Sequence, residues 1–164
     1  MAGITISPTA DVEHLLLFWN GNAIVHGVTV NGQETDVTGV MLRTGDNYWI
    51  DHVTITGFAI DDALTIGAGF SEQSTSEVTI SNYHAYNTDK ALMIGGEPSY
   101  HDSYRSPHVT VFNSKLSARD RNPLLGVKGR AHIYNNVVTP QDWSGIDSQP
   151  VSYTHLTLPT TPYV

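Results

Sequence analysis

Short stretches of alternating apolar and polar residues recur along the chain. Five of them can be placed in register as VTVNG, VTITG, VTISN, VTVFN and AHIYN, beginning at Val28, Val53, Val78, Val109 and Ala131. In each stretch the first and third residues are apolar, and the residue between them is Thr or His. A period of two indicates a β-strand with one buried face. The pattern therefore predicts a strand at each of these places.

The spacing of these stretches predicts a coil. They begin 25, 25, 31 and 22 residues apart, which is typical of a solenoid. The fifth position of each holds only Gly or Asn, namely Gly32, Gly57, Asn82, Asn113 and Asn135. These two residue types adopt positive φ at little cost. A left-handed corner at the same place in every repeat would turn each strand into the next by the same angle.

A second set of apolar segments follows the corners: VMLR from Val40, ALTI from Ala63, ALMI from Ala91 and PLLG from Pro123. Two or three short strands in each repeat of about 25 residues, without helical periodicity, predict an all-β protein that folds as a parallel β-helix. The alternative is an antiparallel β-sandwich, which also has many short strands. We assign residues 1–150 to one partial β-helix domain.

Composition narrows the class of partner. The 164 residues include eight Lys and Arg against sixteen Asp and Glu, with no Cys. A nucleic-acid partner would require an excess of basic residues, so none is expected. The longest apolar run, Leu15 to Trp19, is far shorter than a membrane span, and the start of the chain has no signal-peptide pattern. We expect neither a membrane partner nor a thiolate site.

The end of the chain differs in kind from the rest. Residues 151–164, VSYTHLTLPTTPYV, resemble the translated read-through of a sequencing-library adapter. We expect them to be a non-native tail and the natural sequence to be interrupted near Pro150. They are left out of the fold prediction.

Much of the scarce positive charge lies between residues 119 and 136, in RDRNPLLGVKGRAHIYNN. This stretch contains Arg121, Lys128 and Arg130. Clustered cations in an acidic protein indicate either an anionic ligand or nearby carboxylate partners.

The second set of segments predicts which side chains share a level of the coil. One level holds Thr38, Asp61, Asp89 and Arg121, and the next holds Gly39, Asp62, Lys90 and Asn122. Neighbouring parallel strands lie about 5 Å apart, so Asp61, Lys90 and Arg121 are predicted to face one groove. Such a groove suits a sugar acid, because binding its carboxylate makes the adjacent C–H more acidic and permits β-elimination. A surface ladder of ion pairs is the alternative.

Four stretches, in order, resemble motifs of the pectate lyases, polysaccharide lyase family 1. They are WIDHVTITG (49–57), DDALTIG (61–67), EVTISNYHAYNTDKALMIGG (77–96) and RNPLLGVKGRAHIYNN (121–136). The resemblance covers about residues 21 to 145. It implies a right-handed parallel β-helix that cleaves an acidic polysaccharide, polygalacturonate or pectin, by Ca²⁺-assisted β-elimination. It also implies a secreted protein that is monomeric at full length.

Residue roles follow from the resemblance. It implies Arg121 as the catalytic base and Lys90 as its catalytic partner. A second Arg of the family meets Gly126, so Lys128 is the nearest replacement, and we assign Lys128 and Arg130 to substrate binding. Asp61 matches the first acidic calcium ligand, whereas the second falls on Thr65.

The remaining calcium ligands of the family fall near Thr38 and Val40, which are not acidic. We assign the metal to Asp61 and Asp62, with Asp36 as a further substitute. One or two carboxylates bind Ca²⁺ weakly unless substrate oxygens complete its shell.

Two other functions stay open. Asp61-Asp62 and Asn87-Thr88-Asp89 resemble the paired acids of polygalacturonases, which hydrolyse through two carboxylates. A coil without activity that binds carbohydrate is the non-enzyme alternative. We expect Trp49, Asp51 and His52 to tie a turn to the coil and His132 to belong to a side-chain stack.

Overall fold

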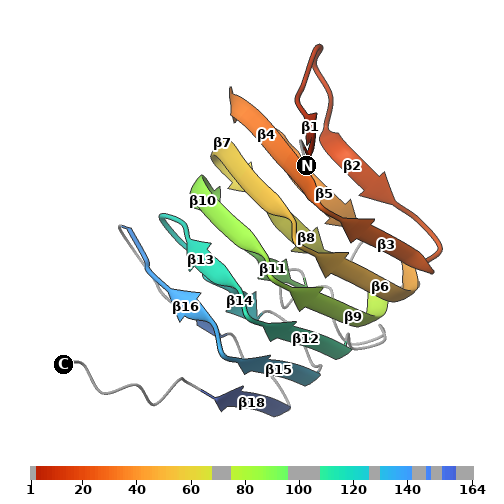
Figure 1. Ribbon diagram of the computed structural model, residues 1–164, viewed down its shortest axis with the longest axis vertical. Helices are drawn as coiled ribbons and strands as arrows, with labels where there is room; N and C mark the ends of the chain where they lie inside the picture. The colour runs from red at the N-terminus through yellow and green to blue at the C-terminus, as the bar shows by residue number, and fades with distance from the viewer. Residues whose placement is uncertain are drawn as a thin grey trace.

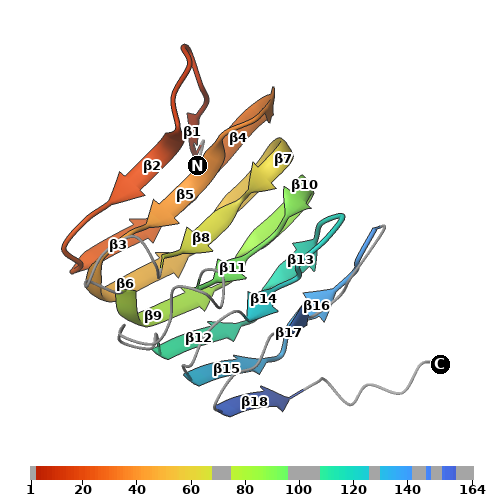
Figure 2. The same cartoon turned by 180° about the vertical axis from the view of Figure 1, so that it is seen from behind.

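Three parallel sheets enclose one core in the computed structural model, which describes residues 3–67, 75–95, 108–125, 130–141, 147–148 and 153–157. All pairs between the described strands are parallel. The strands of successive coils stack from the N-terminal to the C-terminal end (Figures 1 and 2). The predicted right-handed parallel β-helix is confirmed, and the antiparallel sandwich is excluded.

Each sheet has six strands, and one coil passes through sheets A, B and C in turn. Sheet A contains β1 (Ile4–Ile6), β4 (Val28–Thr35), β7 (Thr54–Asp62), β10 (His84–Lys90), β13 (Lys115–Ser117) and β16 (Val137–Val138). Sheet B contains β2 (His14–Phe18), β5 (Thr38–Leu42), β8 (Leu64–Ile66), β11 (Met93–Ile94), β14 (Leu124–Leu125) and β17 (Asp147–Ser148). Sheet C contains β3 (Ala23–His26), β6 (Gly45–Asp51), β9 (Thr75–Ser81), β12 (His108–Phe112), β15 (Arg130–Tyr134) and β18 (Tyr153–Thr157). The described ranges contain no helix, and hence none that could cross a membrane.

The core consists of apolar side chains stacked at matching levels of successive coils. Sheet A contributes the buried column Val30, Ile55, Ala85 and Leu116. Sheet C contributes the buried column Val25, Ile50, Ile80, Val111 and Ile133. Burying one such aliphatic side chain stabilises the fold by about 1.5–3 kcal/mol, so these columns hold the coils in register.

The five segments aligned in the sequence occupy two sheets, and their common register is wrong. VTVNG and VTITG fall in and next to β4 and β7 of sheet A, where Thr29 pairs with Thr54. VTISN, VTVFN and AHIYN fall in and next to β9, β12 and β15 of sheet C. The same alternation around Val-Thr occurs on both sides of the coil, so the pattern does not specify the sheet.

A left-handed corner follows the described strands of sheet C from β3 to β15. It is occupied by Gly27, His52, Asn82, Asn113 and Asn135, with φ of 67°, 51°, 51°, 52° and 52°. The three predicted Asn corners are thus confirmed. The two predicted Gly corners do not belong to this column, since Gly32 and Gly57 lie within β4 and β7.

The strands of sheet B occur where predicted, with a shift in register. Val40 pairs with Leu64 instead of Ala63, which places Gly39 beside Ala63 instead of Asp62. Met93 pairs with Leu124 instead of Leu125. The register of the flanking polar residues therefore differs from the prediction at both ends of the set.

Candidate active site

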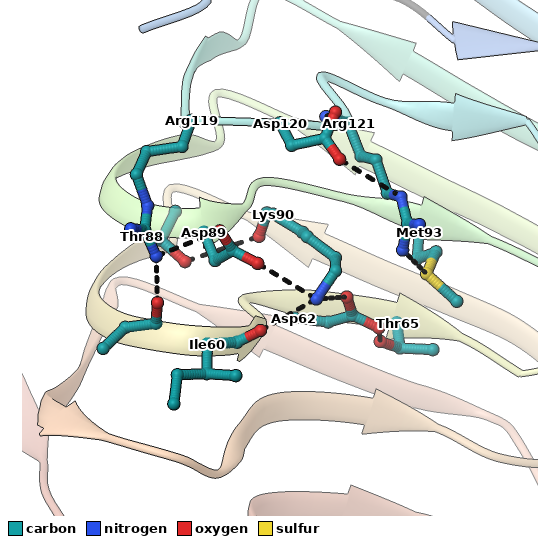
Figure 3. Close-up of polar contacts among 11 residues, drawn as sticks. Ile60, Asp62, Thr65, Thr88, Asp89, Lys90, Met93, Arg119, Asp120 and Arg121 are labelled. Carbon is teal, nitrogen blue, oxygen red and sulfur yellow. Dashed lines mark hydrogen bonds and ion pairs between the residues drawn. The ribbon is translucent and has the colours of Figure 1, made fainter. Parts of the chain in front are cut away.

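Acidic and basic side chains meet where sheet A ends and sheet B begins in three successive coils. Asp62 ends β7 and Lys90 ends β10, and the backbone pairs Lys90 with both Asp62 and Asp120. Figure 3 shows this group, which we call the A–B cluster: Asp62, Asp89, Lys90, Arg119, Asp120 and Arg121. The predicted shared level of Asp62 and Lys90 is confirmed, whereas Asp120 replaces the predicted Asn122.

The coil that carries Arg121 has one extra residue at this corner. Between the Lys90–Asp120 bridge and the Met93–Leu124 pair, one coil has residues 91 and 92 and the next has residues 121 to 123. Arg121 has a φ of 50°, in the left-handed region that side-chain-bearing residues seldom adopt. An extra residue in one strand of a pair bends the chain and redirects a side chain. It also explains why the predicted register fails here.

Three oxygens surround the ammonium of Lys90. Nζ lies 2.8 Å from the carbonyl oxygen of Ile60, 3.1 Å from Oδ2 of Asp89 and 3.8 Å from Oδ1 of Asp62. The Lys90 side chain is 17% exposed. The ammonium is therefore compensated by carboxylates of two coils while it still reaches the surface.

Asp62 connects this ammonium to the interior. Its side chain is buried, and Oδ2 accepts a hydrogen bond of 2.7 Å from the hydroxyl of Thr65. Nearby, the wholly buried Tyr83 donates a hydrogen bond of 2.7 Å to the carbonyl of Ala91. Burial raises the pKa of Tyr83 well above its ordinary value, and the carboxylate of Asp62 adds to the shift.

The guanidinium of Arg121 lies on the same side of the coil as Lys90. Both side chains run toward lower-numbered strands (Figure 3). Nε of Arg121 lies 3.5 Å from Oδ2 of Asp120, and Nη1 lies 3.9 Å from Sδ of Met93. The side chain is 34% exposed. The structure thus directs Lys90 and Arg121, the two residues that the resemblance marks as catalytic, to the same side of the coil.

Arg119 belongs to the same cluster, although it is not among the site residues predicted from the sequence. Nη2 lies 3.0 Å from Oδ1 of Asp89 and also donates a hydrogen bond to the carbonyl of Ala59. Asp89 therefore lies between two cations, Arg119 and Lys90. The A–B cluster contains three cations and three carboxylates. The cationic stretch therefore has nearby carboxylate partners, which was one of the two explanations predicted for it. The sequence feature that could have indicated Arg119 is its position in the cationic stretch of residues 119–136.

Asn122 holds the turn that carries Arg121. Its side chain is fully buried. Oδ1 accepts a hydrogen bond of 2.9 Å from the backbone N–H of Ala118, and Nδ2 donates one of 3.3 Å to the carbonyl of Ala118. These two bonds close residues 118–122 into a loop and fix the direction from which Arg121 projects.

The other predicted site residues are not part of the described cluster. Arg130 is exposed, begins β15 in sheet C and pairs with His108, so the chain passes through sheet B between Arg121 and Arg130. Lys128 and the side chain of Asp61 lie outside the described residues, although the Asp61 backbone belongs to β7. His132 is exposed, and its ring centroid lies 4.7 Å from that of Tyr134 in the same strand, with the rings tilted by 39°.

The described residues of this corner do not fit a calcium site. Ca²⁺ takes six to eight oxygen ligands. Of the predicted pair only Asp62 has a described side chain, and its two oxygens face the ammonium of Lys90 and the hydroxyl of Thr65. In the described part of the chain, the one group of three possible metal ligands is His26, Asp51 and His52, at a different corner.

Comparison with known proteins identifies the family. The family model described as pectate lyase matches residues 2–152, which is nearly the whole chain. The chain belongs to the pectate lyase family. The family predicted from the four motifs is therefore confirmed.

Its relatives include enzymes from bacteria and plants. The chain is 32% identical over 132 residues to a pectin lyase of Bacillus subtilis, covering 71% of the chain and 36% of that protein. It is 26% identical over 141 residues to pectate lyase 1 of Juniperus virginiana, covering 73% of the chain and 36% of that protein. It is 28% identical over 120 residues to pectate lyase E of Dickeya dadantii (strain 3937), covering 65% of the chain and 30% of that protein. A comparison with solved structures gave no match.

The extent of these matches bears on domain organisation. The chain spans about a third of the length of the curated relatives it matches, with 36% of the first two covered. The family match ends at residue 152, close to the predicted start of the tail. Residues 153–157 nevertheless form β18, which pairs with β15. The boundary near residue 150 stays a prediction.

Proposed function

We propose that this protein is a polysaccharide lyase that cleaves polygalacturonate or pectin by β-elimination, with Arg121 as the base and Lys90 as its partner. One observation carries the proposal: successive coils of a pectate lyase family member direct a guanidinium and an ammonium toward the same side. The substrate class is supported by relatives named pectin lyase and pectate lyase.

Each cation has a distinct part in the reaction. Lys90 binds the uronate carboxylate and lowers its negative charge, which makes the adjacent C5–H more acidic. Arg121 takes the C5 proton, and the electron pair of that bond forms the C4–C5 double bond. The C4–O bond breaks at the same time, and the departing sugar oxygen takes a proton from solvent water, while Arg121 returns the C5 proton to solvent. The products are a shortened chain and a chain with an unsaturated end.

The surroundings of Arg121 set a condition on this step. A guanidinium ordinarily stays protonated in proteins and accepts a proton only when uncharged. The carboxylate of Asp120 forms an ion pair with this guanidinium, with Oδ2 3.5 Å from Nε. We therefore expect the Asp120–Arg121 ion pair to weaken when substrate binds.

Substrate also has to compete for Lys90. The uronate carboxylate replaces that of Asp89, which lies 3.1 Å from Nζ and retains Arg119 as a partner at 3.0 Å. Since Asp62 does not supply a calcium site in the described residues, no step is assigned to calcium. Substrate binding by Lys128 and Arg130, secretion and a monomeric state stay predictions that the family resemblance supports.

The test is the ultraviolet absorbance of the unsaturated product, measured with polygalacturonate and with methylated pectin. Arg121→Lys keeps the charge but changes the geometry, so we expect turnover to fall by about 10²–10⁴-fold with an unchanged circular dichroism spectrum. The matched control is Arg119→Lys, for which we expect less than about a tenfold loss, because Arg119 acts through Asp89.

Three results would overturn the proposal. Undiminished turnover by Arg121→Lys would remove Arg121 from its role. New reducing ends without unsaturated product would indicate the polygalacturonase-like hydrolase. Neither product from a folded chain that binds oligogalacturonate would indicate the carbohydrate-binding coil.

A further inference from the structure

A second group of titratable side chains lies at the corner where sheet C ends and sheet A begins. His26 ends β3, Asp51 ends β6, and His52 follows Asp51. One ligand atom from each of the three residues lies within 4.8 Å of the other two. The A–B cluster lies at a different corner of later coils, so this group is independent of the proposed lyase site.

Both imidazoles face one carboxylate oxygen. Nδ1 of His26 lies 2.9 Å from Oδ2 of Asp51, and Nδ1 of His52 lies 2.8 Å from the same oxygen. An ion in tetrahedral coordination, with bonds of about 2.0 Å, separates its ligand atoms by about 3.3 Å. The two imidazole side chains are 62% and 60% exposed, so small rotations admit an ion from solvent.

The carboxylate between the imidazoles is held by the next coil. Oδ1 of Asp51 accepts hydrogen bonds of 2.6 Å from the Ser81 hydroxyl and 2.9 Å from Nδ2 of Asn82. Nε1 of Trp49 donates a bond of 3.0 Å to the same hydroxyl. Hydrogen-bond partners of this kind orient metal ligands in proteins. Burial raises the pKa of Asp51, but the hydrogen bonds that it accepts outweigh burial and hold the pKa well below its ordinary value.

The backbone of His52 gives an independent reason to look for function here. His52 has a φ of 51° in the corner column where the other described coils have Gly27, Asn82, Asn113 and Asn135. A left-handed conformation is less favourable for histidine than for glycine. Strained conformations tend to occur at functional sites. At this corner it places an imidazole beside the fixed oxygen of Asp51.

We propose that His26, Asp51 and His52 bind a divalent transition-metal ion, of the class of Zn²⁺ and Ni²⁺. Two imidazole nitrogens and a carboxylate oxygen suit these ions, whereas Ca²⁺ prefers oxygen ligands alone. His26 belongs to one coil and the other two ligands to the next, so the ion joins neighbouring coils. An ion that binds the folded chain in this way raises its thermal stability.

Calorimetric titration of the chain with Ni²⁺, and separately with Zn²⁺, tests the proposal. We expect one ion per chain and a melting temperature that rises with metal concentration. His52→Asn retains a residue suited to the left-handed corner, as Asn82 and Asn113 are, but removes one ligand. His26→Gln removes the other imidazole. Each variant is expected to weaken binding by about 100-fold or more while its circular dichroism spectrum without metal is unchanged.

The control is His108→Gln. His108 is also exposed and pairs with a carboxylate, with Nδ1 2.8 Å from Oε1 of Glu77, but that pair has one imidazole instead of two. This variant should bind metal as the unmodified chain does. The proposal is overturned by an absence of saturable binding, by unchanged binding in His26→Gln and His52→Asn, or by an equal loss in His108→Gln.

Discussion

Lys90 and Asp62 lie level with each other on neighbouring coils, and Nζ of the lysine is 3.8 Å from Oδ1 of the aspartate. The aspartate is buried, whereas the lysine reaches the surface. The pair therefore connects the interior to the face from which Lys90 and Arg121 project. Its contribution to stability and that of Lys90 to chemistry can be measured separately.

Lys90→Met removes the ammonium that faces the buried carboxylate of Asp62. We expect the free energy of unfolding to fall by about 2–3 kcal/mol, because a buried charge loses its compensation. Urea denaturation measures the change. Lys115→Met, at an exposed position of β13, is the control and should change the value by less than about 0.5 kcal/mol. Equal effects of the two substitutions would show that the Lys90–Asp62 pair contributes no more to the free energy of unfolding than an exposed lysine does.

Asp120→Asn tests whether the ion pair with Asp120 slows the reaction in which Arg121 is the proposed base. Asn retains an oxygen that can accept the hydrogen bond of 2.8 Å from the Arg121 N–H. The negative charge near the guanidinium is lost, so we expect kcat on polygalacturonate to rise severalfold. Steady-state kinetics at constant ionic strength measure it. A fall in kcat with unchanged KM would mean that Asp120 assists Arg121 instead.

Asn122→Ala, compared with a matched control, tests whether the loop that Asn122 closes affects activity beyond its effect on stability. It removes the two hydrogen bonds to Ala118, so we expect a loss of about 1–3 kcal/mol in unfolding free energy and at least a tenfold fall in kcat/KM. Asn136 is the matched control, since it is buried and bonds the Ser114 N–H and the Val111 carbonyl at another corner. Asn136→Ala should cost similar stability and leave kcat/KM of the folded protein within about threefold. Similar kinetic losses in both variants would contradict a specific role for the Asn122 loop.

Tyr83→Phe tests whether the buried hydroxyl of Tyr83 makes the free energy of unfolding depend on alkaline pH. The pKa of Tyr83 is raised in the folded state, so its stabilising effect is complete below the unfolded value of about 10 and is lost as pH rises above it. Near pH 7 the substitution should cost about 1–2 kcal/mol, because the hydrogen bond to Ala91 is lost. Above pH 10 the unmodified protein should lose this advantage, and the two unfolding free energies should converge. Denaturant titrations at several pH values measure the difference, and a constant difference up to pH 11 would contradict the assignment.

Local chemistry explains which parts of the fold were predictable. Alternation of period two and the corner residues Asn82, Asn113 and Asn135 depend on a few neighbouring residues, so the coil can be inferred from the sequence. The assignment of strands to sheets depends on contacts between coils, and the Val-Thr pattern is the same in sheets A and C. His52 was expected to belong to a turn, but its left-handed φ was missed because the common register assigned that corner to Gly57, five residues later.

The residues of the candidate site likewise divide into those that could be predicted from the sequence and those that could not. Asp62 and Lys90 could be aligned because both end strands of sheet A that pair directly. Asp120 was missed because the extra residue near Arg121 depends on the loop that Asn122 closes on Ala118. The Arg119 side chain bonds the carbonyl of Ala59, 60 residues earlier, and such a contact leaves no periodic signal in the sequence.

The A–B cluster draws on three consecutive coils, and described coils continue on both sides of them. In a stacked repeat each unit is supported mainly by its two neighbours. Opening of any one of the three coils would therefore separate Asp62, Lys90 and Arg121, so the cluster exists only while all three coils are stacked.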